Sequence, residues 1–129
     1  MSLCIYATAK GKIIFGFDSH SEEILAPDAD RIAGEGGNPY LPNPAYVEGA
    51  GFDMSEGNLM QVLDLLDLPR RSREFDPVQM REACTAYLAG HPKPADVMTD
   101  AAYFHQRITQ LERVASVGIA HGADVIHAD

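Results

Sequence analysis

The chain has 129 residues, of which 46% are hydrophobic, so it is long enough to bury a core and is predicted to form one globular domain over residues 1–129. Its formal net charge is −9, and this excess of acidic side chains predicts repulsion from nucleic acid and from anionic membranes. Only two cysteines, no apolar run of the roughly 18 residues that span a membrane, and no signal-peptide pattern at the start together favour a cytoplasmic location.

Two runs of β-branched and aromatic residues, 3–8 and 12–17, are predicted to be strands. The residues between them, Ala9, Lys10 and Gly11, suit a tight turn, because glycine adopts a positive φ angle at little cost. The first part of the chain is therefore predicted to form a β-hairpin.

A long stretch rich in glycine and proline, residues 34–51, is predicted to be a loop. Loops of this length in a compact domain are usually functional or disordered. Tyr40 and Tyr46 are its candidate contacts with a partner, because aromatic side chains on a proline-stiffened backbone lose little entropy on binding. Asn38 and Asn43, which form turns in front of prolines, complete the predicted binding set. The alternative is a loop folded over the core with both tyrosine rings half buried.

Two short helices are predicted next, and each has a recognisable start and end. The first begins after Ser55, whose hydroxyl can accept a hydrogen bond from the first turn, and it ends before Pro69. The second begins after Asp76, has a proline at its first position and ends at Gly90. Apolar residues recur at helical spacing in both, so each helix is expected to bury one side.

A third helix is predicted over residues 100–121, with Gly122 as the residue that ends it. Its apolar side includes Leu111, whereas Gln110 is predicted on the solvent side. Residues 123–128 are predicted to be a strand, which needs a sheet to join, and the N-terminal hairpin supplies one. The predicted fold is therefore α+β: a small, mainly antiparallel sheet from the N-terminal hairpin and the C-terminal strand, with three helices packed on one side.

Asp18, His20 and Glu22 are the weak candidates for metal ligands, because carboxylate and imidazole groups in one loop are suitable donors. They follow no ligand-spacing motif, and hydrated loops contain the same residue types, so no metal and no cofactor is expected. The same question arises for a second group, His121, Asp124, His127 and Asp129, of which His127 and Asp129 would share one face of the last strand.

Arg70, Arg71 and Arg73 form the one basic cluster of the sequence. One interpretation is an anion site. The favoured interpretation is a solvated connection between helices whose arginines offset nearby carboxylates, because the surroundings are acidic. His105 lies beside the apolar side of the third helix and is interpreted as a packed or surface residue.

Cys4 supports an enzymatic alternative. If Met1–Leu3 is a leader that is not native, removal of a methionine would expose Cys4 as the N-terminal residue. The order of cysteine, strand, Lys-Gly turn, apolar strand and Gly-Phe-Asp18 then resembles the opening hairpin of the N-terminal-nucleophile hydrolases. The resemblance implies a hydrolase in which the amine of Cys4 is the base for its own thiol and Asp18 belongs to the active site. Otherwise Cys4 and Cys84 are interpreted as small buried hydrophobic residues.

The sequence contains no phosphate-binding loop, no dinucleotide fingerprint and none of the common hydrolase motifs. The leading hypothesis is therefore a small acidic protein that acts as a non-catalytic protein–protein interaction or assembly module and forms a homodimer. A small hydrolase that uses Cys4 is the alternative, so whether the protein is an enzyme stays open. Neither nucleic acid nor a membrane is expected as a partner.

Overall fold

The structure is a computed structural model that describes residues 2–14, 47 and 49–129. Its elements in chain order are β1 (Ser2–Ala9), β2 (Lys12–Ile13), β3 (Gly51–Ser55), α2 (Glu56–Leu65), β4 (Glu74–Phe75), α3 (Pro77–Gly90), α4 (Asp100–Ala120) and β5 (Val125–Ala128). The predicted α+β class is confirmed, because in these residues an antiparallel sheet contains both the N-terminal hairpin and the C-terminal strand, and three helices pack against it. None of the described helices is long and apolar enough to cross a membrane.

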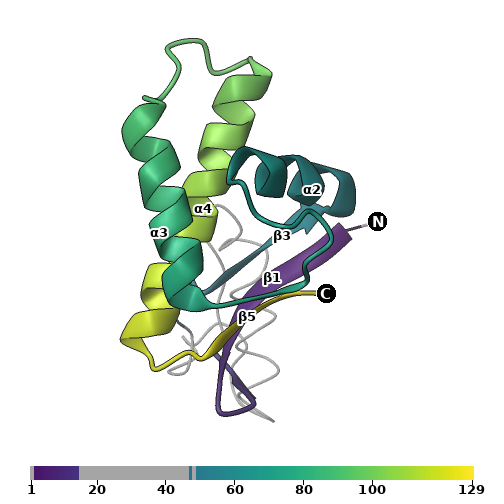
Figure 1. Cartoon of the computed structure of the whole chain (residues 1–129), viewed down its shortest axis with the longest axis vertical. Helices are drawn as coiled ribbons and strands as arrows, with labels where there is room; N and C mark the ends of the chain where they lie inside the picture. The colour runs from purple at the N-terminus through teal and green to yellow at the C-terminus, as the bar shows by residue number, and fades with distance from the viewer. Residues whose placement is uncertain (1, 15–46, 48) are drawn as a thin grey trace, which may run out of the picture.

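β1 is the middle strand of the sheet. β5 pairs with one side of it in antiparallel register, with Ile5 opposite Ala128. β3 and β2 share the other side: β3 runs along the first half of β1, with Ile5 opposite Phe52, and β2 pairs with its end. β4 pairs with the outer side of β5. The two ends of the chain are consequently close together (Figure 1), and the backbone N–H of Cys4 donates to the carbonyl of Asp129 at 2.8 Å.

The turn between β1 and β2 has Lys10 at φ 53° and Gly11 at φ 79°. Two consecutive positive φ angles match the right-handed twist of paired strands. The backbone N–H of Lys10 donates to Asp124 Oδ2 at 3.1 Å, which ties the turn to the segment before β5. The predicted hairpin is therefore confirmed as far as Ile14, and residues 15–17 of its second strand lie outside the described part.

The core lies between one face of the sheet and the helices. α4 packs on β1 and β5, α3 lies alongside α4, and α2 contacts β3 and α4 (Figure 1). The largest fully buried side chains include Ile5, Phe52, Met54, Leu59, Leu63, Met80, Ile108, Leu111 and Ile126. Leu111 is thus buried as predicted.

Hydrogen bonds in the first turns confirm the predicted helix starts. Ser55 Oγ accepts from the N–H of Asn58 at 3.2 Å, and Asp76 Oδ2 accepts from the N–H of Gln79 at 2.8 Å. These bonds satisfy N–H groups that have no partner inside the helix. After α4, Gly122 has φ 80°, the left-handed conformation expected of a residue that ends a helix.

Two short strands, β3 and β4, were not part of the sequence-based prediction. β3 alternates buried Phe52 and Met54 with exposed Asp53. Because β3 leads directly into α2, the sequence does not distinguish its residues from those that precede a helix. β4 has two residues, which is too few for any periodic signal. α2 also ends at Leu65, earlier than the predicted stop before Pro69.

The predicted position of Gln110 on the solvent side of the third helix is wrong, because only 6% of its surface is exposed. α4 is covered on more than one side, since α3 lies along it and Arg107 places its guanidinium 5.8 Å from the ring centre of Phe52 in β3. Gln110 Oε1 accepts a hydrogen bond from Arg107 Nη1 at 2.9 Å. The buried amide therefore has a partner that the hydropathy pattern does not reveal.

Candidate functional site

The face of the sheet opposite the helices carries mainly polar side chains, and the strand register adds the apolar Ile13 and Val125 opposite Thr8. Along β1 alternate residues face the core, so those between them point the other way. The strand register places Asp53 opposite Cys4, His127 opposite Tyr6, and Glu74 opposite His127. We call this surface the polar face and define it by Cys4, Tyr6, Thr8, Asp53, Glu74, His127 and Asp129.

The imidazole of His127 is held on three sides. Its Nε2 is 2.9 Å from Thr8 Oγ1, and its Nδ1 is 3.7 Å from Glu74 Oε1. Its ring stacks on that of Tyr6, with 5.1 Å between the ring centres and 20° between the planes. These contacts come from β1 and β4, the two strands that flank β5, so sheet pairing fixes the orientation of the ring.

Tyr6 and Asp129 form the second contact pair of the polar face. The Tyr6 hydroxyl donates to Asp129 Oδ2 at 2.5 Å, and Asp129 is itself held to Cys4 by backbone hydrogen bonds in both directions. The hydrogen bond to Asp129, together with burial, raises the pKa of Tyr6 to about 12. The phenol therefore stays protonated and acts as a hydrogen-bond donor at neutral pH.

Cys4 is half buried on the polar face. Burial, followed by the charge and hydrogen bonding of Asp53, raises the pKa of its thiol to about 11. A cysteine nucleophile instead needs a lowered pKa, because the thiolate is the reactive form.

The residues before Cys4 belong to the folded sheet. Ser2 and Leu3 pair with β3, and the side chain of Leu3 is only 6% exposed within the core. A chain that began at Cys4 would lose this buried side chain and two paired residues. Asp18, the other residue implied by the hydrolase resemblance, lies outside the described residues.

All four predicted binding residues, Asn38, Tyr40, Asn43 and Tyr46, lie outside the described residues, and so do the weak metal-ligand candidates His20 and Glu22. The two strand residues considered as possible metal ligands, His127 and Asp129, do share one face, but their partners are Thr8, Glu74 and Tyr6. Within the described part of the chain, no group of three or more histidine, cysteine or acidic side chains is placed to hold a metal ion.

The arginine cluster lies next to acidic side chains. Arg70 Nη2 is 3.2 Å from Asp64 Oδ2, and Arg73 Nη2 is 3.1 Å from Glu56 Oε1. These ion pairs favour the interpretation of the cluster as a solvated connection whose arginines offset nearby carboxylates. They also leave fewer positive charges available to bind an anion.

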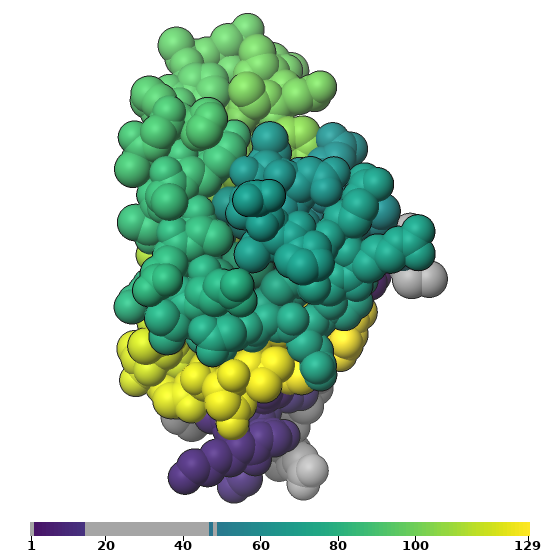
Figure 2. Space-filling view, viewed as in Figure 1, coloured from purple at the N-terminus to yellow at the C-terminus, as the bar shows by residue number. Residues whose placement is uncertain are grey.

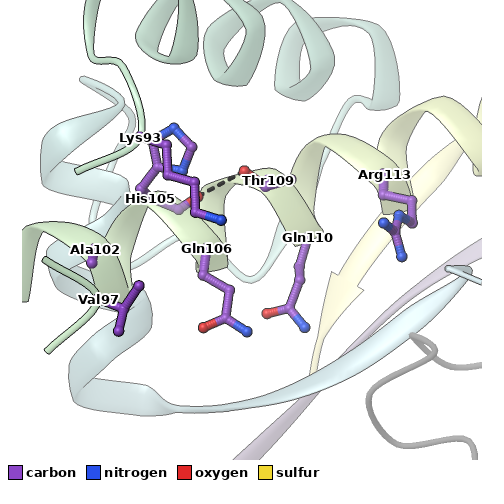
Figure 3. Close-up of a pocket in the computed structure, with 8 residues that line it drawn as sticks. All are labelled: Lys93, Val97, Ala102, His105, Gln106, Thr109, Gln110 and Arg113. Carbon is purple, nitrogen blue, oxygen red and sulfur yellow. Dashed lines mark hydrogen bonds between the residues drawn. The ribbon is translucent and has the colours of Figure 1, made fainter. Parts of the chain in front are cut away.

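A pocket of about 410 Å³ lies between α4 and the connection that joins it to α3 (Figure 3). We call it the α4 pocket. Its described lining residues are Lys93, Val97, Ala102, His105, Gln106, Thr109, Gln110 and Arg113. The six from α4 follow the pattern i, i+3, i+4, i+7, i+8 and i+11, which places them on one side of that helix. The sequence does not predict this pocket, for two reasons. Polar residues on one side of a helix normally indicate a side that faces solvent. No short-range sequence pattern indicates that residues 91–99 fold over this side of α4.

Packing fixes two of the polar side chains in the α4 pocket. Gln110 is held by its bond from Arg107. Arg113 lies against Gly49, which has φ 82°, and a Cβ atom there would be only 2.3 Å from Arg113 Cδ. Figure 3 shows Gln106, Gln110 and Arg113 extending from the same side of α4, with Lys93 reaching toward Gln106 from the connection.

No protein-family model matches the chain, and comparisons with curated proteins and with solved structures find no similar protein. A function must therefore be inferred from the geometry and charge of the two surfaces.

Proposed function

We propose that the protein is a non-catalytic binding module whose polar face receives a lysine- or arginine-rich segment of a partner protein. The observation that supports this proposal is the charge of that face. Asp53, Glu74 and Asp129 lie on it, and no lysine or arginine is among the residues that define it. Among the described residues, these carboxylates form no ion pair with a lysine or arginine.

These carboxylates are in contact with water. Asp53 and Asp129 are exposed, and the Glu74 side chain is 74% exposed, with its Oε1 3.7 Å from His127 Nδ1. Exposed carboxylates clustered on a protein of net charge −9 attract cations and accelerate their encounter. The same charge opposes nucleic acid phosphates and anionic lipids, so a basic polypeptide is the best-matched partner.

The aromatic rings of the polar face are a second reason to propose a basic segment as the ligand. Tyr6 and His127 are stacked at the centre of the face, between Glu74 on one side and Asp129 on the other. A guanidinium group packs favourably over an aromatic ring while it donates to a neighbouring carboxylate. This combination favours arginine over other residues of the partner.

Hydrolysis by Cys4 has weaker support. It needs a thiolate at neutral pH and a free amine on Cys4, whereas burial and Asp53 raise the pKa of the thiol to about 11 and the Cys4 N–H is bound to Asp129. Binding is therefore the function that this geometry supports better.

We also propose that the protein forms a homodimer through the connection between α3 and α4. Val97 is 69% exposed and Met98 is 89% exposed there, and they are the two most exposed large hydrophobic residues among the described ones. This connection forms one end of the molecule (Figure 2), and the strands of the sheet lie toward the other end (Figure 1).

The test of peptide binding uses a fluorescein-labelled peptide of alternating arginine and serine, followed by fluorescence anisotropy. Citrulline in place of arginine gives a neutral control of nearly the same shape. We expect the arginine peptide to bind and the citrulline peptide not to bind. The double variant Asp53→Asn/Asp129→Asn should weaken binding roughly tenfold, because two charge-assisted contacts are lost while the amide oxygen introduced at position 129 can still accept from Tyr6.

The matched control is Asp67→Asn/Glu82→Gln, which removes the same amount of charge from exposed positions outside the polar face. It should bind the arginine peptide like the parent protein. Equal weakening in the two double variants would mean that net charge alone attracts the peptide, and the proposed use of the polar face would be wrong.

A further inference from the structure

The α4 pocket differs in charge from the rest of the protein. Its described lining residues include Lys93, Arg113 and His105 but no aspartate or glutamate, although acidic residues outnumber basic ones by 19 to 10 in the chain. A cavity of about 410 Å³ is also within the size range of small-molecule sites, roughly 300–1,000 Å³. We propose that this pocket binds a small organic molecule through an oxyanion group, either a carboxylate or a phosphate.

The donors in the pocket suit an oxyanion. Lys93 supplies an ammonium group from the connection, and His105 supplies a ring N–H from α4 in either protonation state. Arg113 takes part in another interaction, so the proposal does not rest on a free guanidinium there. Cationic donors give the strongest hydrogen bonds to carboxylate and phosphate oxygens.

The amide groups of Gln106 and Gln110 supply neutral donors beside the Lys93 ammonium group. Because the oxygen of Gln110 accepts from Arg107, its NH2 group is the part of the amide that remains to donate to a ligand. Gln106 lies one turn earlier on the same side of α4 (Figure 3). Thr109 Oγ1 instead donates to the carbonyl of His105 at 2.8 Å, so its hydrogen is already used.

Apolar groups complete the pocket. Val97 from the connection and Ala102 at the start of α4 border the polar donors. A ligand that consisted only of an inorganic ion would leave these surfaces wet, whereas the carbon skeleton of an organic anion would cover them. The pocket therefore fits a molecule with one charged end and a small apolar body.

The test separates the two oxyanion sources with benzoate and phenyl phosphate, which share a ring and differ in the charged group. Each is titrated into 15N-labelled protein, and the backbone amides and the side-chain NH2 groups of Gln106 and Gln110 are followed by NMR. We expect saturable shifts at these amides for at least one of the two ligands, and the ligand that binds more tightly identifies the oxyanion class.

Two variants make the result specific. Lys93→Gln should weaken binding about tenfold, because it removes a cation from the pocket. Lys12→Gln removes an equal charge from exposed strand β2 and should leave binding unchanged. No saturable shift with either ligand up to about 10 mM, or equal weakening by both variants, would overturn the proposal. The polar face takes no part in this experiment, so its outcome is independent of the proposed peptide binding.

Discussion

At the scale of single residues, the polar face shows which contacts a sequence can and cannot reveal. That His127 and Asp129 share a face follows from strand alternation, which is a local property. Their partners Thr8 and Tyr6 lie 119 and 123 positions away in the chain and depend on how β5 is aligned with β1. That alignment results from long-range packing, so no local pattern predicts it.

Gln110, on the helical side of the sheet, is a second residue whose contacts the sequence does not predict. Hydropathy places an amide on the solvent side of a helix, because an unpaired buried amide is costly. Arg107 offsets part of that cost by donating to the Gln110 oxygen, while its guanidinium lies 5.1 Å from the ring centre of Tyr103 and 5.8 Å from that of Phe52. This half-buried polar pair can be recognised only once the packing of Phe52 in β3 against Arg107 of α4 is known.

The thiol of Cys4 is expected to react slowly with iodoacetamide at about pH 8. Because its pKa is about 11, only a small fraction is thiolate there, and the rate should rise as the pH is increased toward that value. Asp53→Asn should lower the pKa and speed alkylation several-fold at about pH 8, because it removes a nearby negative charge. Peptide mass spectrometry over time measures the rate at Cys4, and buried Cys84 reports any unfolding.

At neutral pH, alkylation of Cys4 as fast as that of free cysteine would contradict this prediction. It would also revive the hydrolase alternative, since a reactive thiolate is what that alternative requires.

At the scale of elements, the helices were predictable, but two of the five strands of the sheet were not. Ser55, Asp76 and Gly122 have the expected roles at helix ends, because caps act through backbone groups within one turn. β3 and β4 become strands only through pairing with β1 and β5. The candidate surfaces depend on those pairings and on the fold of residues 91–99, which is why both surfaces were missed.

Gly118→Ala is expected to destabilise the protein. A Cβ atom at this position of α4 would lie 3.1 Å from the Cβ atoms of both Ala7 and Ala123. Those atoms are attached directly to the backbone and cannot rotate away, so α4 or β1 would have to shift. The gain of up to about 1 kcal/mol in helix propensity should be outweighed by an overpacking cost of about 1–3 kcal/mol.

Gly57→Ala is the matched control, because a Cβ there meets nothing within 4 Å. It lies in the exposed first turn of α2 and should raise the free energy of unfolding by up to about 1 kcal/mol. Urea denaturation measures both variants. If Gly118→Ala stabilised the protein as much as Gly57→Ala, the close approach of α4 to β1 would be incorrect.

At the scale of the whole molecule, electrostatic repulsion restricts which surfaces of two copies can form a dimer interface. Each copy carries a net charge of −9, and the carboxylates of the polar face would oppose each other if two polar faces came together. The connection between α3 and α4 is at the opposite end of the molecule from the β1–β2 turn (Figure 1). Its exposed Val97 and Met98 are apolar, so contact through this end keeps the polar faces apart.

The proposed homodimer is therefore expected to strengthen with salt, because screening weakens the repulsion between copies while the apolar contact persists. Light scattering after size exclusion, at high micromolar protein and about 0.05 or 0.3 M salt, measures the mass. Val97→Ser/Met98→Ser should return the protein to a monomer, whereas Ile13→Ser, which changes a side chain 61% exposed in β2, should not. A monomeric mass for the parent protein at both salt concentrations would rule out self-association through this end and would leave peptide binding by the polar face to stand on its own test.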